Sequence, residues 1–347
     1  MFYNVKCYNV IKFIQLKKGN KVKIREISEM SGISIATISR MLKNPNSVKE
    51  STRLKLANAL ESNGIEQFIN LNYIKKIMLI IPNLNNSFYL DLFNGVVYTV
   101  QNKNIPFEIY LSNESMEEEI KIFSRIKDDN GIGVIWIPAS GKRDNLPYEI
   151  DNSNIVALVD RDLNFDSIYI KGLSDNFSAA KQAADLLIEG GSKNPIIITG
   201  SPDLSNARER RDGFLESIKN HFLDDSVNRV YYGNFSDIQS GYNIVKKLLN
   251  DKVVFDSILA ANQILAIGIL KAINESNLSI PKDISIIVFD KLTKMEVEGI
   301  QISEVVFPAF DIGANTAKVL LEQKSSNSLK QIYNYSARFY LRGSENK

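Results

Sequence analysis

A short run of small polar, apolar and basic side chains near the amino terminus has the composition of a surface that contacts nucleic acid bases. The candidates are Ile35, Ala36, Thr37, Ser39 and Arg40. A guanidinium can donate two hydrogen bonds to guanine, and small apolar groups can contact the methyl group of thymine. Hydroxyl groups can donate hydrogen bonds to phosphate oxygens. These residue types predict contact with base edges and with the backbone of a duplex.

Two short helices around a glycine turn are expected to position this run. Residues 24–42 read I-R-E-I-S-E-M-S-G-I-S-I-A-T-I-S-R-M-L. Gly32 permits the turn, and Ser34 is a suitable N-cap for the second helix. The apolar residues expected to point inward are Ile24, Ile27, Met30, Ile33, Ile38, Met41 and Leu42. This layout predicts a helix-turn-helix with its second helix in the major groove, and an ordinary helical hairpin within a core is the alternative.

Positive charge is concentrated in the segment that contains this helix pair. Residues 1–76 hold 14 Lys/Arg and 5 Asp/Glu, whereas the remaining residues hold 28 Lys/Arg and 35 Asp/Glu. A basic module joined to an acidic body favours contact with phosphates at one end of the chain. A solvated charged surface is the alternative, but it does not explain the segregation.

The composition narrows the remaining classes of site. The 347 residues, 44% of them hydrophobic, suffice for two or three domains. Cys7 is the only cysteine and His221 the only histidine, so no internal disulfide or Cys/His metal cluster can form, and His221 is expected at a helix end. Neither a cofactor nor a metal ion is expected.

The amino terminus lacks the features of a secretory signal, and no apolar run approaches the roughly 20 residues that cross a membrane, which predicts a soluble, cytoplasmic protein.

Beyond Lys76, short apolar runs alternate with amphipathic helical stretches such as residues 90–103 and 179–189. The runs expected to form strands are residues 76–82, 107–112, 131–138, 154–160, 195–200, 229–233, 257–262 and 284–290. Nearly continuous hydrophobicity over five or six residues indicates strands that are buried on both faces, as in a parallel sheet. The predicted fold class is therefore α/β, with a helix-turn-helix domain followed by two doubly wound parallel-sheet lobes and a cleft between them.

The expected domain boundaries follow these patterns. They are an extension at 1–20, a helix-turn-helix domain at 21–65, a hinge or linker at 66–76, and a body at 77–347. Lobe 1 of the body comprises about 77–172 plus 305–325, and lobe 2 about 173–304 plus 326–347. The extension could form an amphipathic helix, a basic arm on DNA or, by default, a mobile terminus.

Polar and aromatic residues follow four of the expected strands, at the sheet edge where doubly wound folds bind ligands. They are Asn86, Phe88, Tyr89, Asp160, Arg161, Asn262, Gln263, Asp290 and Lys291. Carboxylates and amides form hydrogen bonds with hydroxyl groups, while aromatic rings cover the less polar faces of a ligand. The mixture predicts a small hydroxylated ligand. For any single residue, capping of the following helix is the alternative.

Six motifs, in order, resemble the lac repressor family (the LacI/GalR transcription regulators) from about Val22 to Gly343. They are S-G-I-S-I-A-T-I-S-R-M-L, P-N-L-N-N-S-F-Y, V-D-R-D-L, A-R-E-R-R-D-G-F, L-A-A-N-Q-I-L-A-I-G-I-L-K-A-I and I-P-K-D-I-S-I-I-V-F-D. The resemblance implies a homodimeric repressor with a periplasmic-binding-protein-like body, whose cleft ligand changes its affinity for DNA. The implied partners are a double-stranded operator and a sugar or nucleoside-like effector.

The resemblance also implies roles for individual residues. Ile35, Ala36 and Arg40 would contact base edges, and the phosphate contacts would be Ser34, Thr37, Ser39 and Asn44. The implied effector contacts are Asn86, Phe88, Tyr89, Asp160, Arg210, Phe235, Asn262 and Asp290. Arg210 is the strongest of these, because it lies three residues before Gly213 in the matching motif, whereas Arg208 has a competing structural role.

The chain departs from the family pattern behind the helix-turn-helix and in the cleft. The link from Gly64 to Lys76 is about five residues shorter than the family's hinge and contains no arginine. Leu71 or Ile69 would have to supply the side chain that wedges into the minor groove. The usual serine before the third helix is Lys49, which moves the expected cap to Ser47. The cleft positions that depart from the pattern are Gln263, Lys291 and Phe307.

Three classes of function are consistent with these features to different degrees. A ligand-responsive, sequence-specific DNA-binding regulator is the leading hypothesis, and the absence of a leucine heptad tail favours a dimer over a tetramer. A cytoplasmic small-molecule binding protein with a decayed DNA-binding function is the alternative, suggested by the short link, and control by a partner protein is a variant. An enzyme is not expected, because the sequence lacks a phosphate-binding loop, a Cys/His pair and a G-x-S-x-G motif.

Overall fold

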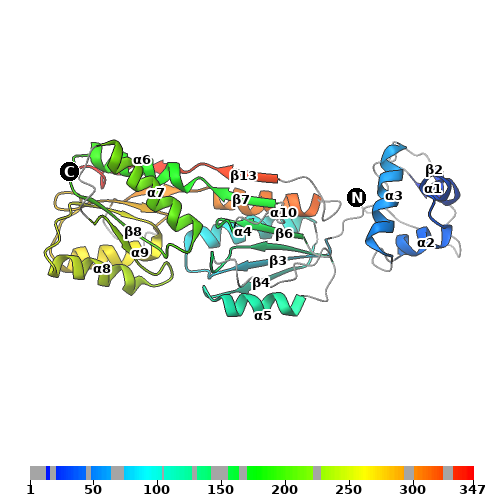
Figure 1. Cartoon of the computed structure of the whole chain (residues 1–347), viewed down its shortest axis with the longest axis horizontal. Coiled ribbons are helices and arrows are strands. Elements are labelled where there is room, and N and C mark those ends of the chain that lie inside the picture. Colours follow the sequence, from blue (N-terminus) through cyan, green and yellow to red (C-terminus); the bar gives the residue numbers. More distant parts are fainter. Residues whose placement is uncertain are drawn as a thin grey trace. The chain divides into compact units, whose positions relative to one another are not determined.

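The computed structural model describes residues 13–15, 21–43, 48–63, 74–103, 105–126, 131–141, 155–163, 170–221, 228–292, 301–322 and 331–347. The chain divides into two compact units (Figure 1). The first comprises Met1–Ile74 with Glu322–Ser328, and the second comprises Lys75–Leu321 with Leu329–Lys347. The hinge expected at 66–76 lies almost entirely outside the described residues.

The described residues of the first unit form three helices around one small core, which confirms the predicted helix-turn-helix. They are α1 (Ile24–Ser31), α2 (Ile35–Lys43) and α3 (Glu50–Ser62). Helix α1 ends at Gly32, whose φ of +62° lies in the left-handed region that glycine adopts without strain. The buried side chains of this core are Ile24, Ile27, Ile33, Ile38, Met41, Val48, Leu56 and Leu60.

Met30 is 42% exposed, so its predicted place in the core was wrong. A step of three residues advances a helix by only about 300°, so positions 24, 27 and 30 drift away from one face. The helical period instead places Ser31 in the core. Ser31 is buried, and its hydroxyl donates a 2.6 Å hydrogen bond to the carbonyl oxygen of Ile27.

A short antiparallel hairpin precedes α1. Strand β1 (Phe13–Gln15) pairs with β2 (Lys21–Lys23), and Ile14 lies opposite Val22. The amphipathic helix considered for residues 1–20 is therefore wrong for the three residues of β1. The intervening sequence L-K-K-G-N contains Gly and Asn, which favour reversal of the chain over continuation of a helix.

The second unit contains two six-stranded sheets, each the centre of one lobe. The sheet of lobe 1 contains β3 (Lys76–Ile81), β4 (Phe107–Leu111), β5 (Ile132–Trp136), β6 (Ile155–Val159), β7 (Ile170–Ser174) and β13 (Gln331–Tyr335). The sheet of lobe 2 contains β8 (Pro195–Thr199), β9 (Val230–Tyr232), β10 (Ser257–Ala260), β11 (Ser285–Phe289), β12 (Ser303–Val306) and β14 (Arg338–Tyr340). The strand orders are β13-β7-β6-β5-β3-β4 and β14-β12-β11-β10-β8-β9. All pairings are parallel except that of β14 with β12, which confirms the predicted α/β architecture.

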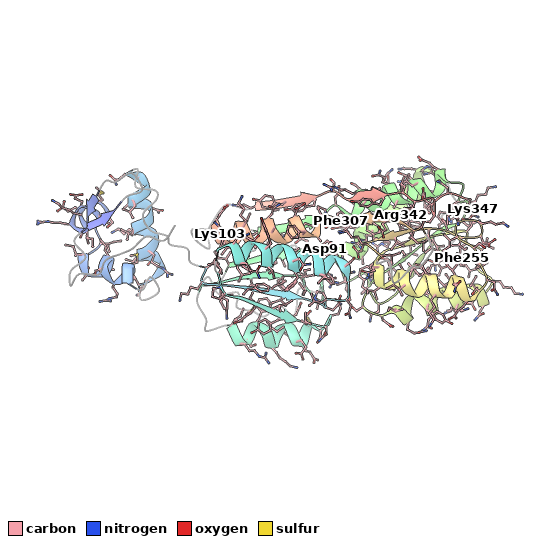
Figure 2. All side chains as sticks on the ribbon, turned by 180° about the vertical axis from the view of Figure 1, so that it is seen from behind. Asp91, Lys103, Phe255, Phe307, Arg342 and Lys347 are labelled. Carbon is pink, nitrogen blue, oxygen red and sulfur yellow. The ribbon has the colours of Figure 1, made fainter. Side chains whose placement is uncertain are left out.

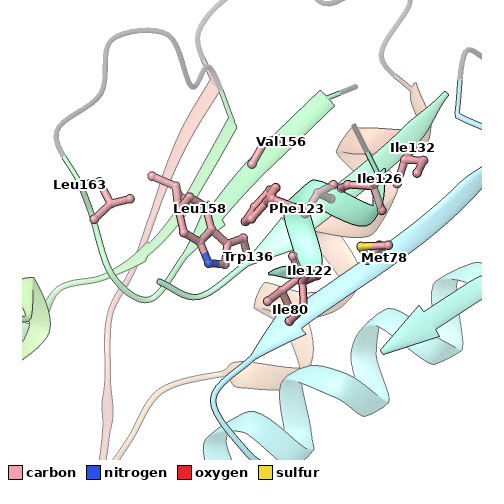
Figure 3. Close-up of a cluster of buried hydrophobic side chains, with 11 residues drawn as sticks. Met78, Ile80, Ile122, Phe123, Ile126, Ile132, Trp136, Val156, Leu158 and Leu163 are labelled. Atoms are coloured by element: carbon pink, nitrogen blue, oxygen red, sulfur yellow. The ribbon is translucent and has the colours of Figure 1, made fainter. Parts of the chain in front are cut away.

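In the described ranges of the body, seven helices cover these sheets. The helices of lobe 1 are α4 (Ser87–Lys103), α5 (Met116–Ile126) and α10 (Ala309–Glu322), and those of lobe 2 are α6 (Asn176–Glu189), α7 (Ser205–Asn220), α8 (Ile238–Asn250) and α9 (Gln263–Glu275). Helix α5 lies on the opposite side of the first sheet from α4 and α10 (Figure 1). Its side chains Ile122, Phe123 and Ile126 pack on the sheet, where the rings of Phe123 and Trp136 meet edge to face with centroids 5.0 Å apart (Figure 3).

All eight runs predicted as strands form strands, but four strands of the body were not predicted. Strand β7 contains Lys171, β12 contains Glu304, and β13 and β14 are polar strands at sheet edges, so none has a continuous apolar run. The sequence-based boundaries assigned 326–347 to lobe 2. The pairing of β13 with β7 corrects this, because it places 331–335 in the sheet of lobe 1.

Candidate functional site

The outward side of α2 carries the candidate base-contacting residues. Ile35, Ala36 and Arg40 are exposed, and Thr37 and Ser39 are partly exposed. Ile35 keeps 49% of its surface accessible, while Ile38 on the same helix is fully buried. The helix therefore has a buried side that holds it on the core and an outer side that combines an aliphatic group, a methyl group and a guanidinium.

Ser34 caps this helix as the sequence predicts. Its Oγ accepts a 3.2 Å hydrogen bond from the backbone N–H of Thr37 and lies 2.8 Å from Thr37 Oγ1. The cap fixes the first turn of α2, the part that contacts base edges in a helix-turn-helix. Asn44 and Ser47 were also predicted to act here, and both lie outside the described residues. Helix α3 begins after Lys49, whose carbonyl oxygen accepts hydrogen bonds from the first turn.

Two buried aspartates lie at equivalent places in the lobes of the body. Asp160 follows β6 in lobe 1 and Asp290 follows β11 in lobe 2, and each is only 5% exposed. Their φ angles are +64° and +72°. Aspartate tolerates this left-handed conformation better than most residues do. The backbone thus turns sharply at the carboxyl end of each strand.

Each aspartate accepts a hydrogen bond from an asparagine of the other lobe. Asn206 of α7 donates through Nδ2 to Asp160 Oδ2 over 2.8 Å, and Asn86 donates through Nδ2 to Asp290 Oδ2 over 3.0 Å. Burial raises the pKa of both carboxyl groups, and the nearby positive charge of Arg210 partly opposes that rise. The two lobes therefore meet through a reciprocal pair of Asn–Asp contacts.

Arg210 lies between these aspartates, where the sequence motif predicted a ligand contact. Its Nε donates a 2.8 Å hydrogen bond to Asn176 Oδ1, and its Nη1 donates to the carbonyl oxygen of Ala261. The guanidinium carbon lies 4.3 Å from the centre of the Phe289 ring. The side chain is thus held over an aromatic ring and close enough to both aspartates to affect their pKa values. Arg208, in contrast, donates hydrogen bonds to the carbonyl oxygens of Pro202 and Asp203 in the loop that precedes its helix.

Arg161 anchors the aromatic wall of lobe 1. Its two terminal nitrogens lie 2.6 and 2.8 Å from the carboxylate oxygens of Glu114, and Nη2 donates a 3.0 Å hydrogen bond to the hydroxyl of Tyr89. The rings of Phe88 and Tyr89 meet edge to face, with centroids 5.8 Å apart. Arg161 is 1% exposed, so this bidentate pair fixes the position of Tyr89.

The side-chain amides of Asn86 and Asn262 each cap a helix and also form a second hydrogen bond within the body. Asn86 Oδ1 accepts a hydrogen bond from Phe88 N, and Asn262 Oδ1 accepts one from Leu265 N at the start of α9. Asn262 Nδ2 also donates a 2.7 Å hydrogen bond to the carbonyl oxygen of Phe235. For these residues capping was the alternative to a ligand contact; the structure shows the capping, and the ligand contact stays a prediction.

The residues that depart from the family pattern contact the opposite lobe. Gln263 Oε1 accepts a 2.7 Å hydrogen bond from Ser87 N, and Lys291 Nζ lies 2.6 Å from Asp91 Oδ2. The carbonyl oxygen of Lys291 also accepts a hydrogen bond from the Ser87 hydroxyl. Phe307 is 3% exposed and packs its ring 6.3 Å from that of Phe289.

A small cavity lies beside these contacts in the described part of the body. It has room for about one water molecule, about 10 Å³, and its lining includes Asp91 and Phe307 at the junction of the lobes (Figure 2). Its remaining lining residues are Ser87, Phe88, Asp290, Lys291, Val306 and Ala309. The hydrogen bond between Asn86 and Asp290 joins the two lobes beside this cavity.

Two buried polar atoms beside Asp160 have no hydrogen-bond partner among the described residues. They are Asn206 Oδ1, an acceptor, and Arg161 Nε, a donor. A buried polar atom without a partner costs about 1–3 kcal/mol. A hydroxyl group can donate one hydrogen bond and accept another, so it has the chemistry to satisfy both atoms.

The sequence did not identify Asn206, Asn176 or Glu114 as parts of this site. Asn206 lies four residues before Arg210, one turn earlier on the same helix, so the helical period was an available signal. Nothing local marked Glu114, because its partner Arg161 lies 47 residues further along the chain.

Among the described residues, no group of three His, Cys, Asp or Glu side chains could hold a metal ion. His221 is the C-cap of α7, at the helix end where it was expected. No helix in the described ranges has the length and apolar character needed to cross a membrane.

Comparison with known proteins agrees with this arrangement of a helix-turn-helix and two lobes. Residues 23–64 match the family model for bacterial regulatory proteins of the lacI family, and residues 184–344 match that for a periplasmic binding protein-like domain. The ribose operon repressor of Bacillus subtilis is 26% identical over 303 residues, which cover 86% of this chain and 90% of that protein. The transcriptional regulator RegA of Clostridium saccharobutylicum is 23% identical, with 89% and 94% covered.

Solved structures share the fold of the described chain. A complex of the transcriptional regulator CelR with cellobiose superposes with a TM-score of 0.70 at 19% identity, covering 93% of this chain and 99% of that one. The transcription regulator CcpA of Lactococcus lactis gives 0.68 at 21% identity, with 79% and 100% covered.

The fold and the site define a class of protein in which a helix-turn-helix is joined to a two-lobed body of the periplasmic-binding type. The chain belongs to the LacI family of bacterial regulatory proteins and is a DNA-binding transcription regulator. The hypothesis of a decayed DNA-binding function is not favoured, because the relatives that match nearly the full chain are named as regulators and repressors.

Proposed function

We propose that this regulator is a cytoplasmic, homodimeric repressor whose affinity for an operator is set by a hydroxylated small molecule bound between the lobes. Helix α2 carries the first half of this proposal. Its Ile35, Ala36 and Arg40 are exposed, and Ser34 caps its amino-terminal end. Two copies of the chain present two such helices to two half-sites of a palindromic operator. Placement in the cytoplasm follows from the DNA partner.

The unpaired atoms beside Asp160 carry the second half of the proposal. Among the described residues, Asn206 Oδ1 and Arg161 Nε are an acceptor and a donor without a hydrogen-bond partner, and Asp160 and Asp290 supply carboxylates nearby. This donor and acceptor set favours a ligand rich in hydroxyl groups over an apolar one. The relatives' names agree with a sugar, because one is a ribose operon repressor and one solved structure is a cellobiose complex.

Selection of bound DNA from a random pool tests the DNA half of the proposal. We expect a palindromic operator, and we expect Arg40→Ala to weaken binding to it by about tenfold or more, since a good arginine–guanine pair contributes about 1–3 kcal/mol. Arg40→Lys is the matched control, because it keeps the charge and loses the bidentate geometry. It should retain binding to random DNA but lose discrimination. Failure of wild type to select any sequence would favour the decayed-function hypothesis.

A thermal-shift panel of ribose, cellobiose, glucose and adenosine tests the ligand half. We expect at least one probe to raise the melting temperature of wild type and to change its operator affinity by about fivefold or more. Asn206→Leu should abolish that shift, whereas Asn220→Leu at the exposed end of the same helix should not. Equal shifts in the two variants would contradict a cleft ligand at Asp160. Analytical ultracentrifugation of wild type with and without operator checks the homodimer.

A further inference from the structure

The loop that precedes α7 in lobe 2 lies against lobe 1 at Gly141. A Cβ added to Gly141 would lie 1.8 Å from the carbonyl oxygen of Asp203, whereas ordinary contacts begin at 3.4 Å. The φ angle of Gly141 is outside the left-handed region, so lack of space, and not backbone conformation, excludes a side chain there. Two residues after Asp203, Ser205 Oγ accepts a 2.8 Å hydrogen bond from Asp162 N of lobe 1. Backbone atoms of the two lobes therefore meet at this loop.

Arg208 fixes the loop to lobe 2. Its Nη1 donates hydrogen bonds of 2.9 Å to the carbonyl oxygen of Pro202 and 2.8 Å to that of Asp203. Leu204, at the N-cap position of α7, is buried. The carbonyl oxygen that faces Gly141 is thus one of the two that Arg208 holds, and it can turn away only by losing that hydrogen bond.

The segment before Gly141 is fixed to lobe 1 in a similar way. The carbonyl oxygen of Pro138 accepts a 2.7 Å hydrogen bond from Arg161 Nη1, and Ala139 N donates one of 2.8 Å to Glu119 Oε1. Arg161 and Glu119 are both buried. Buried hydrogen bonds are costly to break without replacement, so neither side of the contact yields easily.

A side chain at position 141 would therefore be accommodated by a shift of one lobe relative to the other. We propose that Gly141 and the 201–204 loop form a stop that sets how far the lobes close, and that Arg208 is the positioning residue of this stop. The proposal rests on the proposed ligand site between the lobes. The stop determines whether Asn86 and Asn206 come within hydrogen-bond distance of the aspartates of the opposite lobe.

Distances between spin labels in the ligand-free chain test the stop. Cys7 is the only cysteine, so Cys7→Ser gives a background without thiols. Glu117→Cys on α5 and Gln239→Cys on α8 then place one label on each lobe at exposed positions. Double electron–electron resonance on labelled chains diluted with unlabelled chains measures the distance within one chain. We expect Gly141→Ala to add a second, longer distance, and Gly141→Val to increase its share.

Two matched variants separate opening of the lobes from loss of stability. Gly95→Ala also brings a methyl group against a backbone carbonyl oxygen, that of Phe310, but within lobe 1. It should keep the wild-type distance even though it destabilises the lobe. Arg208→Met frees the loop, so the longer distance should be less populated in Gly141→Ala/Arg208→Met than in Gly141→Ala alone. Circular dichroism checks that each variant is folded.

Binding of small molecules gives a second measurement of the stop. Any of ribose, cellobiose, glucose and adenosine that binds wild type should bind Gly141→Ala about fivefold or more weakly, because a smaller fraction of the chains is closed. If none of these probes binds wild type, the ligand half of the proposed function fails, while the label distances still decide whether the stop exists.

Two outcomes would overturn the proposal. A wild-type label distance in folded Gly141→Ala and Gly141→Val would mean that one lobe absorbs the side chain by itself. An equal share of the longer distance with and without Arg208→Met would mean that Arg208 does not position the loop.

Discussion

At the residue scale, Glu119 shows how burial changes the chemistry of a single side chain. It is 3% exposed, and its Oε1 accepts hydrogen bonds of 2.8 Å from Trp136 Nε1 and from Ala139 N. Burial raises the pKa of this carboxyl to about 7, although both hydrogen bonds oppose the rise. The folded-state pKa thus lies above the ordinary value near 4.5. The stability contributed by this group is complete below that value and is lost as the pH rises through about 7.

We expect Glu119→Gln to stabilise lobe 1 at pH 8 by up to about 3 kcal/mol and to have little effect at pH 5. The amide oxygen keeps both acceptor roles, while the charge that is costly to bury is gone. Urea unfolding at the two pH values measures the difference. Glu118→Gln, on the exposed side of the same helix beside Lys121, should show no such pH dependence. An equal gain at pH 5 and pH 8 would contradict the assignment to ionisation.

Residue type and position alone indicated several residues that meet where the lobes join, but not the residues to which they are hydrogen-bonded. Asn86, Asp160 and Asp290 follow buried strands. The apolar sequence of those strands is sufficient to predict where each one ends. Their hydrogen bonds join residues 46 and 204 positions apart in the chain, as in Asn206 with Asp160 and Asn86 with Asp290. Such pairs depend on how the lobes close, and a single sequence contains no direct signal for that.

At the scale of elements, the close approach of α4 and α10 depends on the absence of two side chains. A Cβ added to Gly95 would lie 2.0 Å from the carbonyl oxygen of Phe310, and one added to Gly313 would lie 2.2 Å from that of Leu92. Both obstacles are backbone atoms, which cannot rotate away as a side chain can. The two helices can touch only because each presents a glycine to the backbone of the other.

We expect Gly95→Ala to destabilise lobe 1 by about 1–3 kcal/mol, because α4 and α10 must separate to admit the methyl group. Denaturant unfolding followed by far-ultraviolet circular dichroism measures the loss. Asn94→Ala is the matched control, since Asn94 is exposed on the same helix and its replacement should change stability by less than about 0.5 kcal/mol. If both variants were equally stable, the contact between these helices would be looser than the structure indicates.

Apolar periodicity in the sequence predicted the buried strands and missed the exposed ones. The eight runs predicted as strands are the ones with continuous apolar sequence, and β3, β5 and β6 are almost wholly buried. Strand β13 carries exposed residues such as Tyr333, and only its pairing with β7 defines it. An edge strand of this kind is stabilised by backbone hydrogen bonds, which its side chains do not reveal.

At the scale of the whole molecule, the chain combines two units with very different cores. Among its described residues the first unit buries eight apolar side chains around three short helices, whereas the second unit contains two six-stranded sheets and their helices. Near its carboxyl end the chain also crosses between the two lobes twice. It passes from β12 in lobe 2 to α10 and β13 in lobe 1, and then back to β14 in lobe 2. The unequal cores predict unequal stability, because three helices within residues 24–62 have little apolar surface to bury.

The difference in core size leads to a prediction about independent unfolding. Ile38 is fully buried in the first unit and Ile35 is half exposed on the same helix. We expect Ile38→Ala to cost about 2–5 kcal/mol, which is enough to unfold a unit of this size. Ile35→Ala should leave the unit folded. Both variants should lose operator binding, the first because α2 is no longer formed and the second because a base contact is missing. Differential scanning calorimetry should then show the transition of the first unit lost only in Ile38→Ala, with the transition of the body unchanged in both. A lower melting temperature of the body in Ile38→Ala would mean that the two units unfold together.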